Sequence, residues 1–109
     1  MERLMTTRKI GALPVSTTIL ICAADAGQRA YARTSFSERG WYVLETGFSE
    51  VGQVARSVKV DLVVVISATE GAIAMVRDAF ASARAELTHV VQVKHAAMAR
   101  DAVRQRLGH

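Results

Sequence analysis

The feature that most constrains this chain is an apolar stretch near its middle, residues 61–66, which reads Asp-Leu-Val-Val-Val-Ile. The run is too short for a buried helix, and its β-branched residues favour a strand. A strand that is apolar on both faces is typical of the middle of a parallel sheet that is covered on both sides. Ligands and reactive groups in open α/β sheets lie at the carboxyl ends of such strands. The sequence therefore directs attention first to Ile66 and to Ser67 and Thr69 after it.

The composition fits one compact domain. The chain has 109 residues, half of them apolar, and a net charge of +4. This size allows a modest core and the apolar content argues against disorder. The single cysteine, Cys22, excludes a disulfide within the chain, which is consistent with a cytoplasmic location. No apolar run is long enough to span a membrane, and no glycine-rich nucleotide motif is present.

The first 15 residues show no periodicity, and we expect a mobile basic leader before a domain at 16–109. A signal peptide is the alternative, because a basic start and an apolar segment precede an Ala-x-Ala pattern at 24–26. Pro14, Ser16 and the two threonines after it interrupt the apolar segment. Cleavage there would also remove a strand that the rest of the chain needs, so we favour the leader.

Strand and helix patterns alternate along the rest of the chain. The expected strands cover residues 17–22, 41–45, 61–66 and 88–93, and the expected helices cover 26–38, about 50–58, 71–85 and 96–107. Asp25 and Ser49 are suited to cap the first two helices, and Gly40 to follow the end of the first one. Such alternation with short connections predicts an α/β fold, a three-layer sandwich around a parallel sheet with right-handed crossovers.

Three stretches, together with this order of elements, resemble the receiver domain of bacterial two-component response regulators over roughly residues 17–95. Residues 19–46 have an apolar strand, a turn, a helix and then Gly-aromatic-x-Val at the start of a second strand. Residues 61–67 (DLVVVIS) resemble the strand that ends in the phosphorylated aspartate, and residues 70–80 (EGAIAMVRDAF) resemble the helix after it. The resemblance implies a flavodoxin-like sheet of about four strands, in the order 2-1-3-4, without the family's fifth β-α unit.

The reactive positions of the family are missing. The acidic pair that a working receiver places after its first strand falls on Ala23 and Ala24, and the phosphoacceptor position falls on Ile66. The hydroxyl residue after the fourth strand falls near Val93 or Lys94. In an alternative alignment the last β-α unit is the family's final one, so that Lys94 matches the family's lysine and the fourth unit is lost instead. We therefore expect a degenerate phosphorylation pocket, with no enzymatic activity, no metal and no cofactor.

A receiver-like chain that lacks the residues for phosphorylation implies a phosphorylation-independent signalling module that acts by protein contact. Its partner would be a kinase, a regulator or a second copy in a homodimer. An unpaired apolar edge strand invites such contacts. The predicted interaction face combines the fourth strand with the last helix and consists of Val91, Val93, Met98 and Val103. The alternative is that this helix simply folds over the edge.

Two other classes of function stay open. Arg100, Arg104 and Arg106 on the last helix would serve a nucleic-acid-associated protein. Asp25, Glu45 and Glu70 would form a displaced acidic pocket at the strand ends in a small ligand-binding or catalytic domain. Ser67 lacks an adjacent base, and the histidines lack the spacing of metal ligands. We expect Ser67 to have a structural role and His95 to lie in a loop.

Overall fold

Strands and helices alternate in the computed structural model, which describes residues 17–36 and 41–107. The strands are β1 (Thr17–Ala23), β2 (Trp41–Thr46), β3 (Leu62–Ile66) and β4 (His89–Val93). The helices are α1 (Ala26–Thr34), α2 (Val51–Ser57), α3 (Ala72–Ser82) and α4 (Ala99–Leu107), and the 3-10 turns η1 (Phe48–Glu50) and η2 (Ala96–Met98) precede α2 and α4. The predicted leader at 1–15 and the predicted stop at Gly40 lie outside the described residues.

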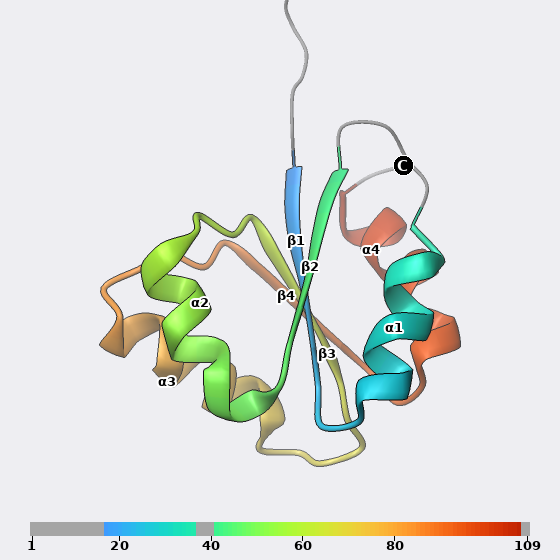
Figure 1. Ribbon diagram of the computed structural model, residues 1–109, viewed down its shortest axis with the longest axis horizontal. Helices are drawn as coiled ribbons and strands as arrows, with labels where there is room; N and C mark the ends of the chain where they lie inside the picture. The colour runs from blue at the N-terminus through green and yellow to red at the C-terminus, as the bar shows by residue number, and fades with distance from the viewer. Residues whose placement is uncertain (1–16, 37–40, 108–109) are drawn as a thin grey trace, which may run out of the picture.

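All four strands are parallel and lie in the order β2-β1-β3-β4 (Figure 1). β1 lies between β2 and β3, with Ile21 aligned to Glu45 on one side and to Val64 on the other. Cleavage after residue 26 would therefore remove a strand from the inside of the sheet. The predicted flavodoxin-like α/β fold with the order 2-1-3-4 is confirmed.

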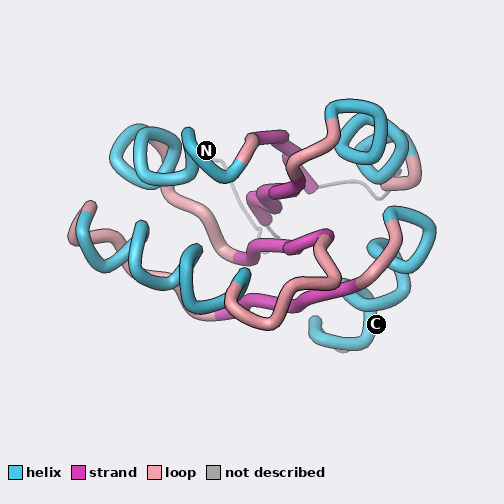
Figure 2. Tube along the Cα trace, turned by 90° about the horizontal axis from the view of Figure 1, so that it is seen from below, coloured by secondary structure: helices cyan, strands magenta, loops and turns pink. Residues whose placement is uncertain are grey.

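The sheet is the middle of three layers. Viewed from the carboxyl ends of the strands, two pairs of helices flank a stack of strands (Figure 2). Leu62, Val64 and Ile66 of β3 pack into one hydrophobic cluster with residues of α1, η2 and α4. Val63 and Val65 pack into the other with residues of α2 and α3. The complete burial of β3 explains why its sequence is apolar without alternation.

The start of α1 follows the prediction and its end does not. The Asp25 carboxylate accepts a hydrogen bond of 2.8 Å from the backbone N–H of Gln28, which is the expected N-cap. The helix ends at Thr34 instead of continuing to residue 38, of which 37 and 38 lie outside the described part. The backbone N–H of Ser35 bonds the Ala32 carbonyl and tightens the last turn. Phe36 then packs against Trp41, with ring centroids 5.7 Å apart.

The predicted cap at Ser49 is wrong. Residues 48–50 form η1, and α2 begins only at Val51, after Glu50, without a side-chain cap. The Ser49 hydroxyl donates to the Glu50 carboxylate instead. The last helix likewise begins with a 3-10 turn, so that α4 starts at Ala99 and not at residue 96.

α3 ends three residues before the predicted residue 85, at Ser82, because the chain turns into the left-handed region at Arg84, where φ is 57°. The N–H of Ala85 bonds the Phe80 carbonyl and the N–H of Arg84 bonds the Ala81 carbonyl, each at 3.0 Å. This pair of bonds is the Schellman C-cap, which usually has glycine at the left-handed position.

The last helix packs on the α1 side of the sheet. Ala99 and Val103 belong to the same cluster as Ala32 of α1. A right-handed crossover from β4 to a further strand beyond it would place the helix on the α3 side, as it does for α3 between β3 and β4. α4 therefore covers a face of the sheet and does not lead past the edge of β4.

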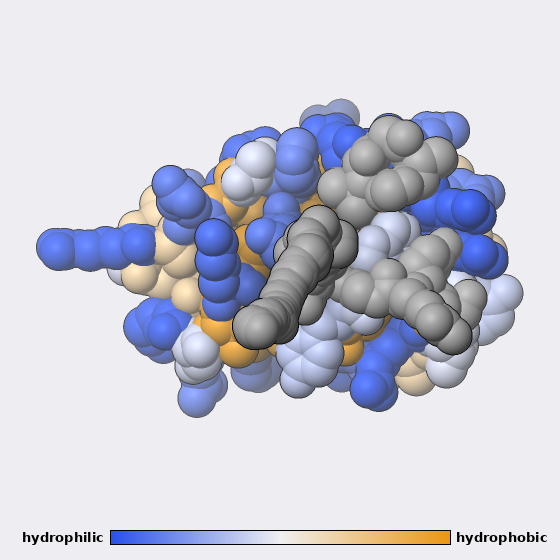
Figure 3. Space-filling view, turned by 90° about the horizontal axis from the view of Figure 1, so that it is seen from above, coloured by the Kyte–Doolittle hydropathy of each residue, from blue (hydrophilic) through white to orange (hydrophobic). Residues whose placement is uncertain are grey.

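Among the described residues, no helix is long and apolar enough to cross a membrane. The view onto the amino ends of the strands shows apolar surface between hydrophilic side chains on the α2–α3 side (Figure 3). A groove there, about 320 Å³ in volume, lies between the end of α2 and residues 85–86 after α3.

Candidate functional site

The positions predicted for a degenerate pocket lie at the carboxyl edge of the sheet. The register aligns Ala23 with Ile66, and Ile66 with Val93, so three strand ends meet there with apolar residues. All three side chains are buried, whereas Ala24 and Lys94, the next residues along the chain, are exposed. The structure thus brings Ala23 and Ile66 together at the place where the resemblance puts the pocket, with no carboxylate between them.

A cation lies at this edge. The Nη1 atom of Arg29, from the first half of α1, donates to the Ala23 carbonyl at 2.6 Å and to the Ala24 carbonyl at 3.3 Å. Arg29 is half-buried, and its Nη1 would lie 3.6 Å from a Cβ added at Gly47, after β2. The guanidinium therefore satisfies carbonyls at the end of β1. No motif in the sequence pointed to Arg29, because its role depends on how α1 turns back over β1.

The loop after β3 is held in place by Gln92 of β4. Its Nε2 donates to the Ser67 carbonyl at 2.7 Å and to the Thr69 carbonyl at 2.9 Å. The Ser67 hydroxyl accepts from the N–H of Thr69 at 3.0 Å, and the Ser67 N–H donates to the Val93 carbonyl at 2.9 Å. Ser67 therefore has the structural role that the sequence favoured. Gln92 was missed because a glutamine in a strand has no distinctive pattern.

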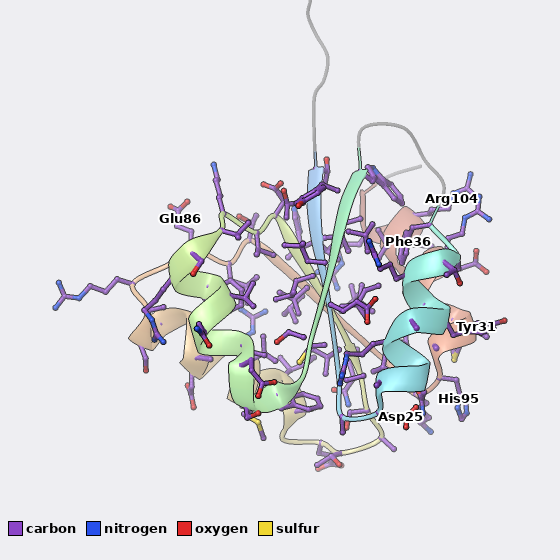
Figure 4. All side chains as sticks on the ribbon, in the orientation of Figure 1. Asp25, Tyr31, Phe36, Glu86, His95 and Arg104 are labelled. Atoms are coloured by element: carbon purple, nitrogen blue, oxygen red, sulfur yellow. The ribbon has the colours of Figure 1, made fainter. Side chains whose placement is uncertain are left out.

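The three acids of the alternative pocket do not form a cluster. Asp25 caps α1, and Glu45 lies 3.6 Å from Arg33 in an ion pair. Within residues 17–36 and 41–107, no group of three or more His, Cys, Asp or Glu side chains could hold a metal ion. Figure 4 shows Asp25 and His95 on the side of the molecule where the strands have their carboxyl ends, each at the start of a helical segment.

The described cysteine, Cys22, is part of the core. Burial raises the pKa of its thiol from 9.0 to about 12; the positive charge of Arg29 lowers it by a smaller amount, and Glu50 raises it slightly. A thiol with such a pKa stays protonated near neutral pH and is a poor nucleophile. The structure thus supports the packing role that the sequence suggested.

The predicted interaction face is not a single exposed surface. Val91 and Val93 are 8% and 7% exposed, and Val103, on the side of α4 that faces the sheet, is fully buried. Met98 is 50% exposed. The three valine side chains are buried because α4 packs on the α1 side of the sheet and covers them, so the interaction face stays a prediction in which only Met98 is exposed. What remains open at β4 is its backbone edge.

The three arginines of α4 do not share one face. At 100° per residue, Arg104 lies about 40° around the helix from Arg100, whereas Arg106 lies about 240° away. Arg106 lines a groove beside β4, and Figure 4 shows Arg104 at the amino end of the α1–α4 side. A nucleic-acid role stays a prediction without the support of one basic face.

The groove beside β4 is about 530 Å³ in volume. Its floor is Val90, Val91 and Gln92, one wall is Ile73 of α3, and the other wall belongs to α4. A second groove of about 260 Å³ continues along α4 past Val93 and Met98. The first groove runs along the outer side of β4, and the second begins at Val93 and Met98, next to the carboxyl edge of the sheet.

Comparisons with protein-family models, with curated proteins and with solved structures gave no match.

Proposed function

We propose that this chain is a phosphorylation-independent, receiver-like signalling module that acts by contact with another protein. The receiver resemblance and the confirmed strand order 2-1-3-4 support the class. Fold alone does not fix function, so the proposal depends on the carboxyl edge of the sheet. A bacterial, cytoplasmic setting and the absence of enzymatic activity are parts of the same proposal.

The observation that carries the proposal is the Arg29 guanidinium on the Ala23 carbonyl, 2.6 Å away. A receiver needs a carboxylate as phosphoacceptor and oxygen ligands for Mg²⁺. Here the strand ends offer Ala23 and Ile66, and a built-in cation bonds the carbonyls that close β1. A second cation brought to this edge would be repelled by the guanidinium.

The loop after β3 also supports a function that does not depend on phosphorylation. Gln92 bonds the carbonyls of Ser67 and Thr69, so the segment that would follow a phosphoacceptor is already fixed without a phosphoryl group. A regulatory signal carried by this edge would need a two-state element. The proposed module instead presents one constant surface to its partner.

The test is incubation of the full chain with acetyl phosphate and Mg²⁺, followed by intact-mass measurement. We expect no added phosphoryl group, because the described strand ends provide no carboxylate for it. A working receiver under identical conditions is the positive control. A stable, hydroxylamine-sensitive phosphoryl group on an aspartate would refute the proposal, and loss of that group in Asp25→Asn would identify its position.

A further inference from the structure

The outer edge of β4 has backbone groups that point away from the sheet. The Val93 carbonyl accepts from the Ser67 N–H, so the backbone groups of Val93 face β3. Successive residues of a strand alternate, so those of Val91 also face β3 while those of Val90 and Gln92 face outward. β4 is the outermost strand of the sheet, and among the described residues α4 is the helix that lies beside its edge (Figure 2). The strand, HVVQV, contains no Lys or Pro, residues that often protect such an edge.

We propose that a second copy of this chain pairs with β4 in an antiparallel arrangement, with the twofold axis at Val91. The inference rests on the proposed function, since it names the partner of the protein contact. In this register Val90 of each copy faces Gln92 of the other. The outward N–H and carbonyl groups of both residues then form four hydrogen bonds across the axis, and Val91 meets its equivalent in the pair without hydrogen bonds.

The groove surface of one copy is complementary in charge to the same surface of a second, reversed copy. Asp101, in the first turn of α4, lines the groove near Val93, and Arg106, in the last turn, lines the groove near Val90. Gln105 and Ala102 line both. A twofold axis at Val91 reverses the direction of the partner helix and so brings each Asp101 toward the partner's Arg106. A surface that is acidic at one end and basic at the other favours a second copy over a partner of single charge.

The spacing of the helices fits the same arrangement. α4 packs on both β4 and β3, so each helix axis lies about half a strand spacing inside β4. Pairing two β4 strands would separate the two α4 axes by about two strand spacings, on the order of 10 Å. Packed helices lie about 8–10 Å apart. The two α4 helices would therefore contact each other through the side that carries Ala102 and Gln105.

The other edge of the sheet is less suited to self-pairing. A groove of about 260 Å³ beside β2 is lined by Leu44 and Val54, and also by Glu45 and Glu50. Among the described residues no basic one lines this groove, so β2 lacks the opposite charges at its two ends that would make it complementary to a second copy. The proposal is therefore specific to β4.

The first experiment is size-exclusion chromatography with light scattering on the full chain over a range of concentrations. We expect a dimer of twice the 11.8 kDa chain mass at high concentration. Asp101→Arg and Arg106→Glu each place like charges opposite each other twice per dimer, and each should raise the dissociation constant on the order of tenfold. The double variant D101R/R106E exchanges the two charges and should restore the dimer.

Arg56→Glu is the matched control, because Arg56 is also exposed and in the last turn of its helix, α2, away from β4. It should leave the dissociation constant unchanged. Circular dichroism checks that every variant is folded. A wild-type monomer at all concentrations, an assembly that grows beyond two copies, or a double variant no better than the single ones would overturn the proposal.

Hydrogen exchange then tests the register. In the dimer the amides of Val90 through Val93 should all be protected, whereas dilution or Arg106→Glu should expose those of Val90 and Gln92 alone. A dimer in which these two amides exchange rapidly would overturn the pairing through β4. A monomeric result leaves the acetyl phosphate result untouched, so failure of this inference is distinguishable from failure of the proposed function.

Discussion

Asp25, Arg29 and Gln92 each fix local structure through hydrogen bonds, but only the role of Asp25 could be predicted from the sequence. The cap at Asp25 could be predicted, because an aspartate directly before a helix pattern has few other roles. The roles of Arg29 and Gln92 could not, since each depends on a carbonyl brought close by the fold. Arg29 reaches back to the end of β1, and Gln92 reaches across from β4 to residues 23 and 25 positions earlier in the chain. Local pattern carries no information about such partners.

Arg84 gives a prediction at this scale. It occupies the left-handed position of the C-cap of α3, where φ is 57° and a side chain is strained. Arg84→Gly should raise the free energy of unfolding by about 0.5–1 kcal/mol, because glycine removes this strain. Arg77→Gly, in the exposed interior of α3, should lower it by about 1 kcal/mol. Urea unfolding of both variants measures the difference; two changes of the same sign would contradict the prediction.

The elements themselves were predictable where hydrophobic pattern is strong. Every expected strand is present, with ends within one residue of the prediction. The helices were less exact, since their ends depend on turns such as η1 and on the C-cap at Arg84. The burial of the valines in the candidate interaction face could not be predicted for a similar reason. Apolar residues on β4 and α4 were identified, but the pattern does not say whether they face solvent or each other.

The loop between β3 and α3 gives a prediction for an element. Gln92→Met keeps the length of the side chain but removes the donor to the Ser67 and Thr69 carbonyls. Two hydrogen bonds are worth about 1–2 kcal/mol together, so the Thr69 amide should exchange roughly tenfold faster or more. Amides of α2, on the far side of α3, should be unaffected. Unchanged exchange at Thr69 would mean that the loop does not depend on Gln92.

At the scale of the whole molecule, the topology could be predicted and the position of the last helix could not. Alternating strands and helices with right-handed crossovers leave few arrangements for a parallel sheet. Nothing in the pattern of α4 chooses between the α1 and α3 sides, because no strand follows it among the described residues. By packing on the α1 side, α4 completes the hydrophobic cluster that contains Ile19, Val64 and Val103.

Val103 tests how far α4 belongs to this core. The side chain is fully buried between α4 and the sheet, so Val103→Ala should lower the free energy of unfolding by about 2 kcal/mol. Met75→Ala, at an exposed position of α3, should change it by less than about 0.5 kcal/mol. Thermal and urea unfolding give both values. A small effect at Val103 would mean that α4 is a loosely attached arm.

The acidic rim of β2 has a consequence for assembly. In the proposed dimer the two sheets join at β4 into one of eight strands, in the order β2-β1-β3-β4 followed by the partner's strands in reverse. Both outer ends of that sheet are then β2, bordered by Glu45 and Glu50. No basic residue of the described part of the chain lines the groove at these ends, so dimers that approach end to end find no opposite charges to hold them together. Pairing at β4 would thus end at two copies and would not continue into fibres.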